Sequence, residues 1–103
     1  MLPLEGVKVI DMSHIFMGPG AALHMADQGA EVIKVEPMTG DAVRWRWAMP
    51  GLGEPELGKA FLGINRNKRS IAVDVRTTEG QEIVHRLAMW ADALIVNFRP
   101  GAE

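Results

Sequence analysis

The chain has 103 residues, 48% of them hydrophobic, a net charge of −2 and no cysteine. This length allows one small domain, the charge argues against a protein that coats nucleic acid, and the lack of thiols excludes disulfide frameworks and zinc–thiolate sites. No apolar run approaches the ~18 residues of a membrane span, and the N-terminus does not resemble a signal peptide. We therefore expect a cytoplasmic protein that binds neither membrane nor nucleic acid.

The first third of the chain predicts a βαβ unit. Residues 7–12 are rich in β-branched side chains and predict a buried strand. After a turn at Gly18-Pro19-Gly20, residues 21–28 are good helix formers that stop at Gly29. Residues 31–36 predict a second strand, parallel to the first through a right-handed crossover.

Residues 37–63 carry many glycines and prolines and no period. An irregular segment of this length predicts a functional loop, a lid or a surface that a partner covers. A short helix is expected near residues 41–47. Trp45 and Trp47, next to Arg44 and Arg46, suit a partner interface or a core position.

Regular patterns return at residue 70. Residues 70–75 and 93–96 predict two more strands, and the segment between them carries an apolar stripe at helical spacing. Thr78, three residues before Gln81, has the pattern of a capping box. The order β-α-β-loop-β-α-β predicts an open, mainly parallel α/β sheet of Rossmann type, with strands 7–12, 31–36 and 93–96 buried on both faces.

In such a sheet, ligands bind beyond the carboxyl ends of the strands, where Arg76, Asn97 and Arg99 are expected to meet. The stretch 65–69 holds three positive charges in five residues. It is interpreted either as a solvated turn or as a clamp for phosphates or carboxylates. His14, at the same edge as Arg76, is a candidate general base or a hydrogen-bonded loop residue, whereas His24 and His85 are interpreted as surface or packing residues.

Two further site types find little support. Gly18 and Gly20 match two glycines of the dinucleotide fingerprint, and Glu36 could serve as its ribose-binding acid, but the third glycine is absent. The alternative is that both glycines make a tight, closely packed turn. No His, Asp and Glu residues have the spacing of a metal site, so no metal is expected.

Ordered motifs along nearly the whole chain resemble the start of family III CoA-transferases, of the formyl-CoA transferase and carnitine-CoA transferase type. They are Leu4-Glu5-Gly6-Val7-Lys8-Val9-Ile10-Asp11, Gly18-Pro19, Ala26-Asp27-Gln28-Gly29-Ala30-Glu31-Val32-Ile33-Lys34-Val35-Glu36-Pro37, Asn65-Arg66-Asn67-Lys68-Arg69-Ser70-Ile71, Thr78-Glu79-Gly80 and Ala91-Asp92-Ala93-Leu94-Ile95-Val96-Asn97-Phe98-Arg99-Pro100-Gly101. Residues 38–63 match least well.

The resemblance implies that residues 1–103 form the Rossmann-like, CoA-binding N-terminal segment of such an enzyme, incomplete relative to the family. Members transfer CoA between an acyl-CoA and a carboxylic acid through an aspartyl-CoA intermediate, as interlocked homodimers and without a prosthetic group. Their nucleophilic aspartate lies beyond residue 103. No catalytic residue is therefore assigned here, and whether the chain works with a second chain that supplies the catalytic half stays open.

By position, the resemblance places contacts to CoA or acyl-CoA on seven residues: Ile15, Phe16, Val73, Arg76, Asn97, Phe98 and Arg99. The two arginines would hold phosphate oxygens and Phe98 would pack on the adenine. A family arginine after the second strand is replaced by Pro37, so Arg44 or Arg46 is a candidate substitute.

Three alternatives remain open at this point. The chain could resemble an α-methylacyl-CoA racemase, although that branch has a Gly-Tyr pair where Asn97-Phe98 stands here. It could be a non-catalytic module that binds CoA or another protein. It could also be a nicotinamide-dependent Rossmann protein.

Overall fold

The structure is a computed structural model that describes residues 1–44 and 59–100. Its centre is a four-stranded sheet in the order β3-β2-β1-β4, in which every neighbouring pair is parallel. The strands are β1 (Lys8–Asp11), β2 (Glu31–Glu36), β3 (Arg69–Ala72) and β4 (Ala93–Ile95). This is the predicted open parallel sheet. The chain order reverses between β1 and β4, which makes that junction the topological switch point.

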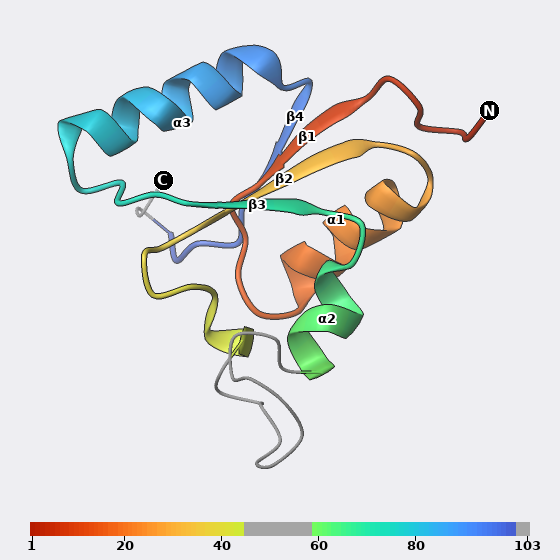
Figure 1. Ribbon diagram of the computed structural model, residues 1–103, viewed down its shortest axis with the longest axis horizontal. Helices are drawn as coiled ribbons and strands as arrows, with labels where there is room; N and C mark the ends of the chain where they lie inside the picture. The colour runs from red at the N-terminus through yellow and green to blue at the C-terminus, as the bar shows by residue number, and fades with distance from the viewer. Residues whose placement is uncertain (45–58, 101–103) are drawn as a thin grey trace.

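Two helices cover opposite faces of the sheet (Figure 1). Helix α1 (Met17–Asp27) connects β1 to β2, and α3 (Thr78–Trp90) connects β3 to β4. Side chains alternate along each strand, so Val9 and Val32 enter the α1 core while Ile10 and Val35 enter the α3 core. Apolar residues of the central strands thus supply the core on both faces of the sheet.

Helix α1 begins at Met17, four residues before the predicted start at residue 21. Gly18 and Pro19 belong to its first turn, where a backbone N–H has no intrahelical partner and proline therefore costs nothing. The loop between β1 and α1 is correspondingly short. Residues 12–16, called here the β1–α1 turn, make the whole connection.

The described residues of the segment 37–63 include parts of two short helices. A 3₁₀ helix, η1 (Ala42–Arg44), lies where a short helix was expected, and α2 (Lys59–Asn65) was not predicted. Gly63 conceals α2 in the sequence because glycine is a poor helix former. Helix α2 lies beside α1 (Figure 1). Trp45, Arg46 and Trp47 lie outside the described residues.

One burial prediction is wrong. Strand β4 pairs with β1 alone in the described part of the chain and forms an edge of the sheet, and Leu94 is 55% exposed. The continuous apolar run 93–96 could not show this, because position in the sheet is a property of the whole fold. No helix within residues 1–44 and 59–100 has the length and hydrophobicity needed to cross a bilayer.

Candidate functional site

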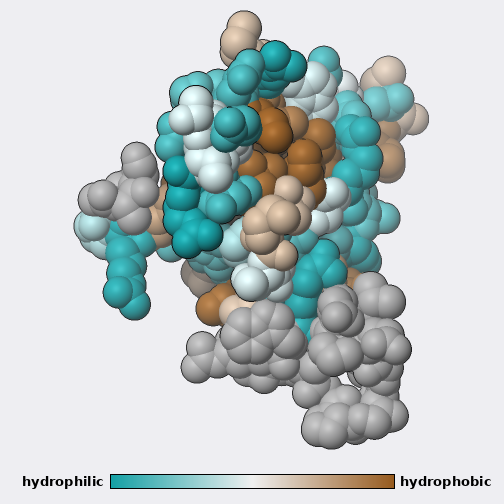
Figure 2. Space-filling view, turned by 60° about the vertical axis from the view of Figure 1, so that its left-hand side comes forward, coloured by the Kyte–Doolittle hydropathy of each residue, from teal (hydrophilic) through white to brown (hydrophobic). Residues whose placement is uncertain are grey.

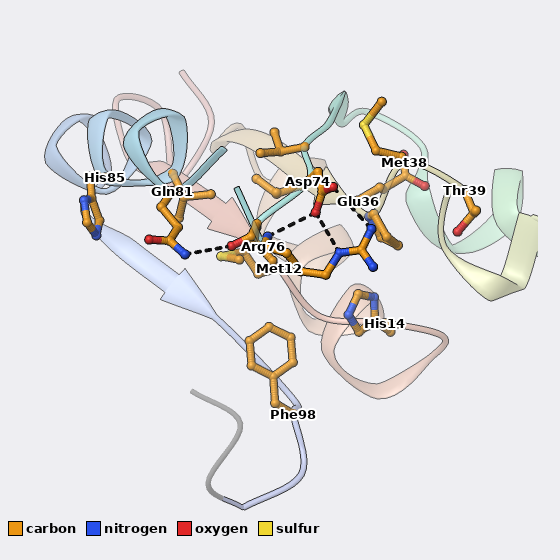
Figure 3. A pocket seen from close by; sticks show the side chains of 15 residues that line it. Met12, His14, Glu36, Met38, Thr39, Asp74, Arg76, Gln81, His85 and Phe98 are labelled. Atoms are coloured by element: carbon orange, nitrogen blue, oxygen red, sulfur yellow. Dashed lines mark hydrogen bonds and ion pairs between the residues drawn. The ribbon is translucent and has the colours of Figure 1, made fainter. Parts of the chain in front are cut away.

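A cavity of about 860 Å³ lies at the carboxyl edge of the sheet, on the α3 side. That size is typical of sites for cofactors and drug-sized ligands. The lining comes from the ends of β1 and β2, the segment after β3, helix α3 and the segment after β4 (Figure 3). It comprises Met12, His14, Val35, Glu36, Pro37, Met38, Thr39, Val73, Asp74, Val75, Arg76, Gln81, Val84, His85 and Phe98. Figure 2 brings this side of the molecule forward and shows a cluster of apolar side chains surrounded by polar ones.

The cationic wall of the cavity is Arg76. Its Nε donates to Asp74 Oδ1 at 3.0 Å and an Nη donates to Asp74 Oδ2 at 3.2 Å, and the backbone N–H of Arg76 also donates to Oδ1 at 3.1 Å. These hydrogen bonds from Arg76 hold the pKa of Asp74 below its ordinary value. The Arg76 side chain is 88% exposed, and a guanidinium has five N–H donors. Asp74 thus orients a guanidinium that still presents donors to a ligand.

The aromatic wall is Phe98, whose ring centroid lies 5.7 Å from that of His14 at an interplanar angle of 33°. The backbone of His14 is held by Asn97: His14 N–H donates to Asn97 Oδ1 and Asn97 Nδ2 donates to His14 O, both at 2.9 Å. These bonds cross the switch point between β1 and β4. They hold the backbone that carries the His14 ring close to Phe98, and the two neighbouring rings offer an aromatic surface against which a planar base can pack.

Helix α3 supplies Gln81, Val84 and His85 to the cavity. Its first turn is anchored by Thr77, whose hydroxyl oxygen accepts from the Gly80 N–H at 2.9 Å, so the cap is Thr77 and not the predicted Thr78. His85, interpreted from its sequence position as a surface or packing residue, is exposed and also lines the cavity. The spacing i, i+3, i+4 of residues 81, 84 and 85 is the signal that puts the three on one helix face.

The structure brings three of the seven proposed CoA contacts, Val73, Arg76 and Phe98, around the cavity. Asn97 lies beside the cavity and holds the β1–α1 turn through the backbone of His14. Ile15 and Phe16 lie in the β1–α1 turn, outside the lining, and Arg99 is exposed beyond it.

The candidate substitute Arg44 is already engaged elsewhere. It binds Glu36 with both Nε, at 2.6 Å, and an Nη, at 2.8 Å, and its guanidinium stacks 3.7 Å from the Phe61 ring centroid. Glu36 is 4% exposed, and its carboxylate also accepts from the hydroxyl of Ser70 and from the N–H of Asp41. Burial raises the pKa of Glu36, but the hydrogen bonds from Arg44, Ser70 and Asp41 outweigh this and hold it at about 2. A carboxylate so occupied is not placed to bind a ribose, which removes the main support for a nicotinamide protein.

The stretch 65–69 is a solvated turn in part, since the Arg66 and Arg69 side chains are 57% and 65% exposed. Its Lys68 is buried, with Nζ 2.8 Å from Asp11 Oδ2, 2.9 Å from Pro19 O and 2.7 Å from Asn65 Oδ1. Arg66 pairs with Asp27, and Arg69 pairs with Glu31. The positive charges are thus used within the fold, and Lys68 ties β1, α1 and α2 together.

The glycines near the start of α1 serve close packing, as the alternative interpretation held. A Cβ on Gly18 would lie 2.2 Å from Ser13 Cβ, a distance that no pair of non-bonded carbon atoms tolerates. Gly18 therefore allows α1 to approach the β1–α1 turn.

Within the described residues, no three His, Cys, Asp or Glu side chains cluster as a metal site requires.

Comparisons with known proteins agree with this geometry. The model of one family, CoA-transferase family III, matches residues 4–103. Succinyl-CoA:glutarate CoA-transferase of Homo sapiens is 43% identical over 100 residues, which are 96% of this chain and 22% of that protein. Formyl-CoA:oxalate CoA-transferase of Escherichia coli O6:H1 is 39% identical over 102 residues, covering 97% of this chain and 24% of that protein.

Among solved structures, a CAIB/BAIF family protein from Brucella suis superposes with a TM-score of 0.89 at 42% identity. The alignment covers 97% of this chain and 27% of that one. The chain thus spans about a quarter of the length of these relatives.

Proposed function

The chain belongs to CoA-transferase family III, and we propose that it forms the CoA-binding part of an enzyme that transfers CoA between an acyl-CoA and a carboxylic acid. The observation that carries this proposal is the cavity at the carboxyl edge of the sheet, with an oriented guanidinium on one side and an aromatic wall, His14 beside Phe98, on the other. CoA carries phosphates and a planar adenine, which are the two groups that such walls recognise. The substrates of the proposed enzyme are CoA thioesters and carboxylic acids, and the enzyme needs no prosthetic group.

In the proposed binding mode, Arg76 donates to phosphate oxygens and Phe98 packs against the adenine. Arg76 is suited to this because a guanidinium offers paired donors to an anion. Val73, one of the most buried residues of the lining at 4% exposure, forms part of the cavity floor. The other proposed contacts, Ile15, Phe16, Asn97 and Arg99, would meet CoA outside this cavity.

We propose that the transfer passes through an aspartyl-CoA thioester, and that the attacking aspartate is none of those in this sequence. Each of the five is already hydrogen-bonded: Asp11 to Lys68, Asp27 to Arg66, Asp41 to Ile15, Asp74 to Arg76 and Asp92 to Lys8. Asp74 alone among them lines the cavity, and its pairing with Arg76 stabilises the carboxylate and weakens it as a nucleophile. In this proposal the residues of the chain bind and orient CoA.

We also propose that the functional unit is a homodimer. Support comes from the exposed apolar side chains on and beside the edge strand β4, where Leu94 is 55% and Val96 40% exposed. An edge strand with exposed apolar groups is usually covered by further protein. Sedimentation equilibrium checks this: a purely monomeric, folded chain at high concentration contradicts it.

The test of CoA binding is a calorimetric titration of the chain with CoA and with 3′-dephospho-CoA. We expect saturable binding, and Arg76→Gln should weaken it about 10-fold, as the loss of one charge-assisted hydrogen-bonding group does. Arg86→Gln is the matched control, because Arg86 is an exposed arginine of α3 that pairs with Glu82 outside the cavity. A folded chain that releases no heat with either ligand, or an Arg76→Gln variant that binds like the wild type, contradicts the proposal.

A further inference from the structure

The β1–α1 turn contains a residue in a conformation that its side chain disfavours. Ile15 has φ +72°, in the left-handed region, which a β-branched residue rarely adopts. Such a conformation persists only where the surroundings enforce it, and it is concentrated at functional sites. The cause must therefore lie in the contacts of the turn.

The backbone of this turn is held by side chains from three separate segments. Ser13 N–H donates to Asp11 at 3.0 Å, and His14 N–H donates to Asn97 at 2.9 Å. Ile15 N–H donates to both carboxylate oxygens of Asp41, each at 3.2 Å. Asp41 is 26 positions from Ile15 in the sequence, in the connection that follows β2.

Asp41 is itself held in place by Lys34 of β2. Lys34 Nζ lies 2.9 Å from Asp41 Oδ2 and donates to Ser13 O at 3.2 Å, and the two side chains are 1% and 0% exposed. Together the pair binds a carbonyl on one side of His14 and an N–H on the other. Burial raises the pKa of Asp41, but hydrogen bonds from the Val43 N–H and Lys34 outweigh it and keep the pKa below the ordinary value.

His14 connects the Lys34–Asp41 pair to the cavity. It stands between Ser13 and Ile15, whose backbone the pair binds, and its ring lines the cavity beside Phe98 (Figure 3). If the turn relaxed toward the ordinary φ of isoleucine, the peptide that follows His14 would rotate. The wall formed by His14 and Phe98 would then lose its alignment.

We propose that Asp41, held by Lys34, is a positioning residue for acyl-CoA binding: it keeps Ile15 in the left-handed conformation and so aligns His14 with Phe98. This inference rests on the proposed function, since the ligand of the aligned wall is CoA. Asp41 does not touch that ligand. Its contribution is transmitted through the backbone of the β1–α1 turn.

The test uses Asp41→Asn with two readouts, the hydrogen-exchange rate of the Ile15 amide by NMR and the affinity for CoA by calorimetry. We expect the Ile15 amide to exchange faster while the amides of β1 and β2 keep their protection, and CoA to bind about 10-fold more weakly. Asp27→Asn is the matched control, because Asp27 is an aspartate that pairs with Arg66 and lies outside the turn. It should change neither readout.

The discriminating variant adds Ile15→Gly to Asp41→Asn. Glycine adopts positive φ without strain, so the turn no longer needs Asp41 to hold it. Because Ile15 is itself a proposed contact of CoA, the reference is Ile15→Gly alone. The double variant should bind CoA within about 3-fold of that single variant, which a merely structural role of Asp41 would not allow. Should Asp41→Asn not fold, Lys34→Met with Asp41→Asn removes both charges and leaves neither buried alone; it should fold and show the same two changes.

Unchanged exchange of the Ile15 amide overturns the inference. So does wild-type CoA affinity in a folded variant whose Ile15 amide exchanges faster, or a loss of affinity on Asp41→Asn that is as large in the Ile15→Gly chain as in the wild type. A wild-type chain that binds no CoA contradicts the proposed function and, with it, the role of Asp41 in binding. A chain that binds CoA equally well with and without Asp41 contradicts the inference alone.

Discussion

Lys68 Nζ lies 2.8 Å from Asp11 Oδ2, although the two residues are 57 positions apart, and neither side chain is more than 1% exposed. Burial lowers the pKa of Lys68, while the hydrogen bond from Lys68 to Asp11 opposes that shift. The ammonium has an acceptor for each of its three protons. This pair explains why a lysine stands directly before β3.

Replacing Lys68 with methionine should lower the free energy of unfolding by about 3 kcal/mol, because Asp11 would lose its nearest cation and remain buried. Urea denaturation measures the change. Arg66→Met is the control, since the Arg66 side chain is 57% exposed in its pair with Asp27 and should contribute below about 1 kcal/mol. Equal effects of the two variants would show that the buried pair contributes no more to the free energy of unfolding than the exposed pair does.

The stability of the fold should fall in acid through Glu36. Its pKa is 4.5 when unfolded and about 2 when folded, so its contribution is fully present above pH 4.5 and is lost as the pH falls toward 2. The difference corresponds to about 3 kcal/mol. Urea denaturation between pH 7 and pH 2.5 should show this loss, and Glu36→Gln should flatten that part of the profile. An identical slope in Glu36→Gln, or the same flattening in the exposed Glu82→Gln, would contradict the assignment.

Gly18→Ala should destabilise the chain by about 2 kcal/mol or more, because the added methyl group would overlap Ser13 and force α1 away from the β1–α1 turn. Gly63→Ala is a control of the same chemistry. Gly63 lies within α2, with open space at the position of its Cβ, so alanine should stabilise by about 0.5–1 kcal/mol through helix propensity. Thermal denaturation of both variants gives the comparison, and a tolerated Gly18→Ala would refute the close approach.

Thr77→Ala should cost about 1 kcal/mol, since it removes the hydroxyl that accepts from the Gly80 N–H at the start of α3. Thr78→Ala, one position along and exposed, should cost less. If Thr78→Ala were the more harmful change, the helix would begin at the residue that the capping-box pattern indicated. Denaturation monitored by circular dichroism separates the two cases.

The order of elements and the parallel sheet follow from short-range patterns. Runs of β-branched residues, the helix formers before Gly29 and the apolar stripe after Thr78 each lie within a few turns or one strand. The sequence alone therefore determined the α/β architecture and the edge of the sheet that carries the cavity. It also placed Val73, Arg76 and Phe98 at that edge. Propensity signals were weakest where single residues oppose them, as Gly63 does in α2.

Tertiary structure decided which charges are buried, which strand lies at the edge, and how the β1–α1 turn is held. Lys68 meets Asp11 only because the residue before β3 lies beside β1, and Asp41 meets Ile15 only because the segment after β2 lies beside the β1–α1 turn. A charge run near residue 68 indicates solvent in sequence, since burying a lysine is unfavourable until a carboxylate and two carbonyl oxygens surround it. Those partners come from separate segments of the chain, and only the folded backbone brings them within hydrogen-bonding distance.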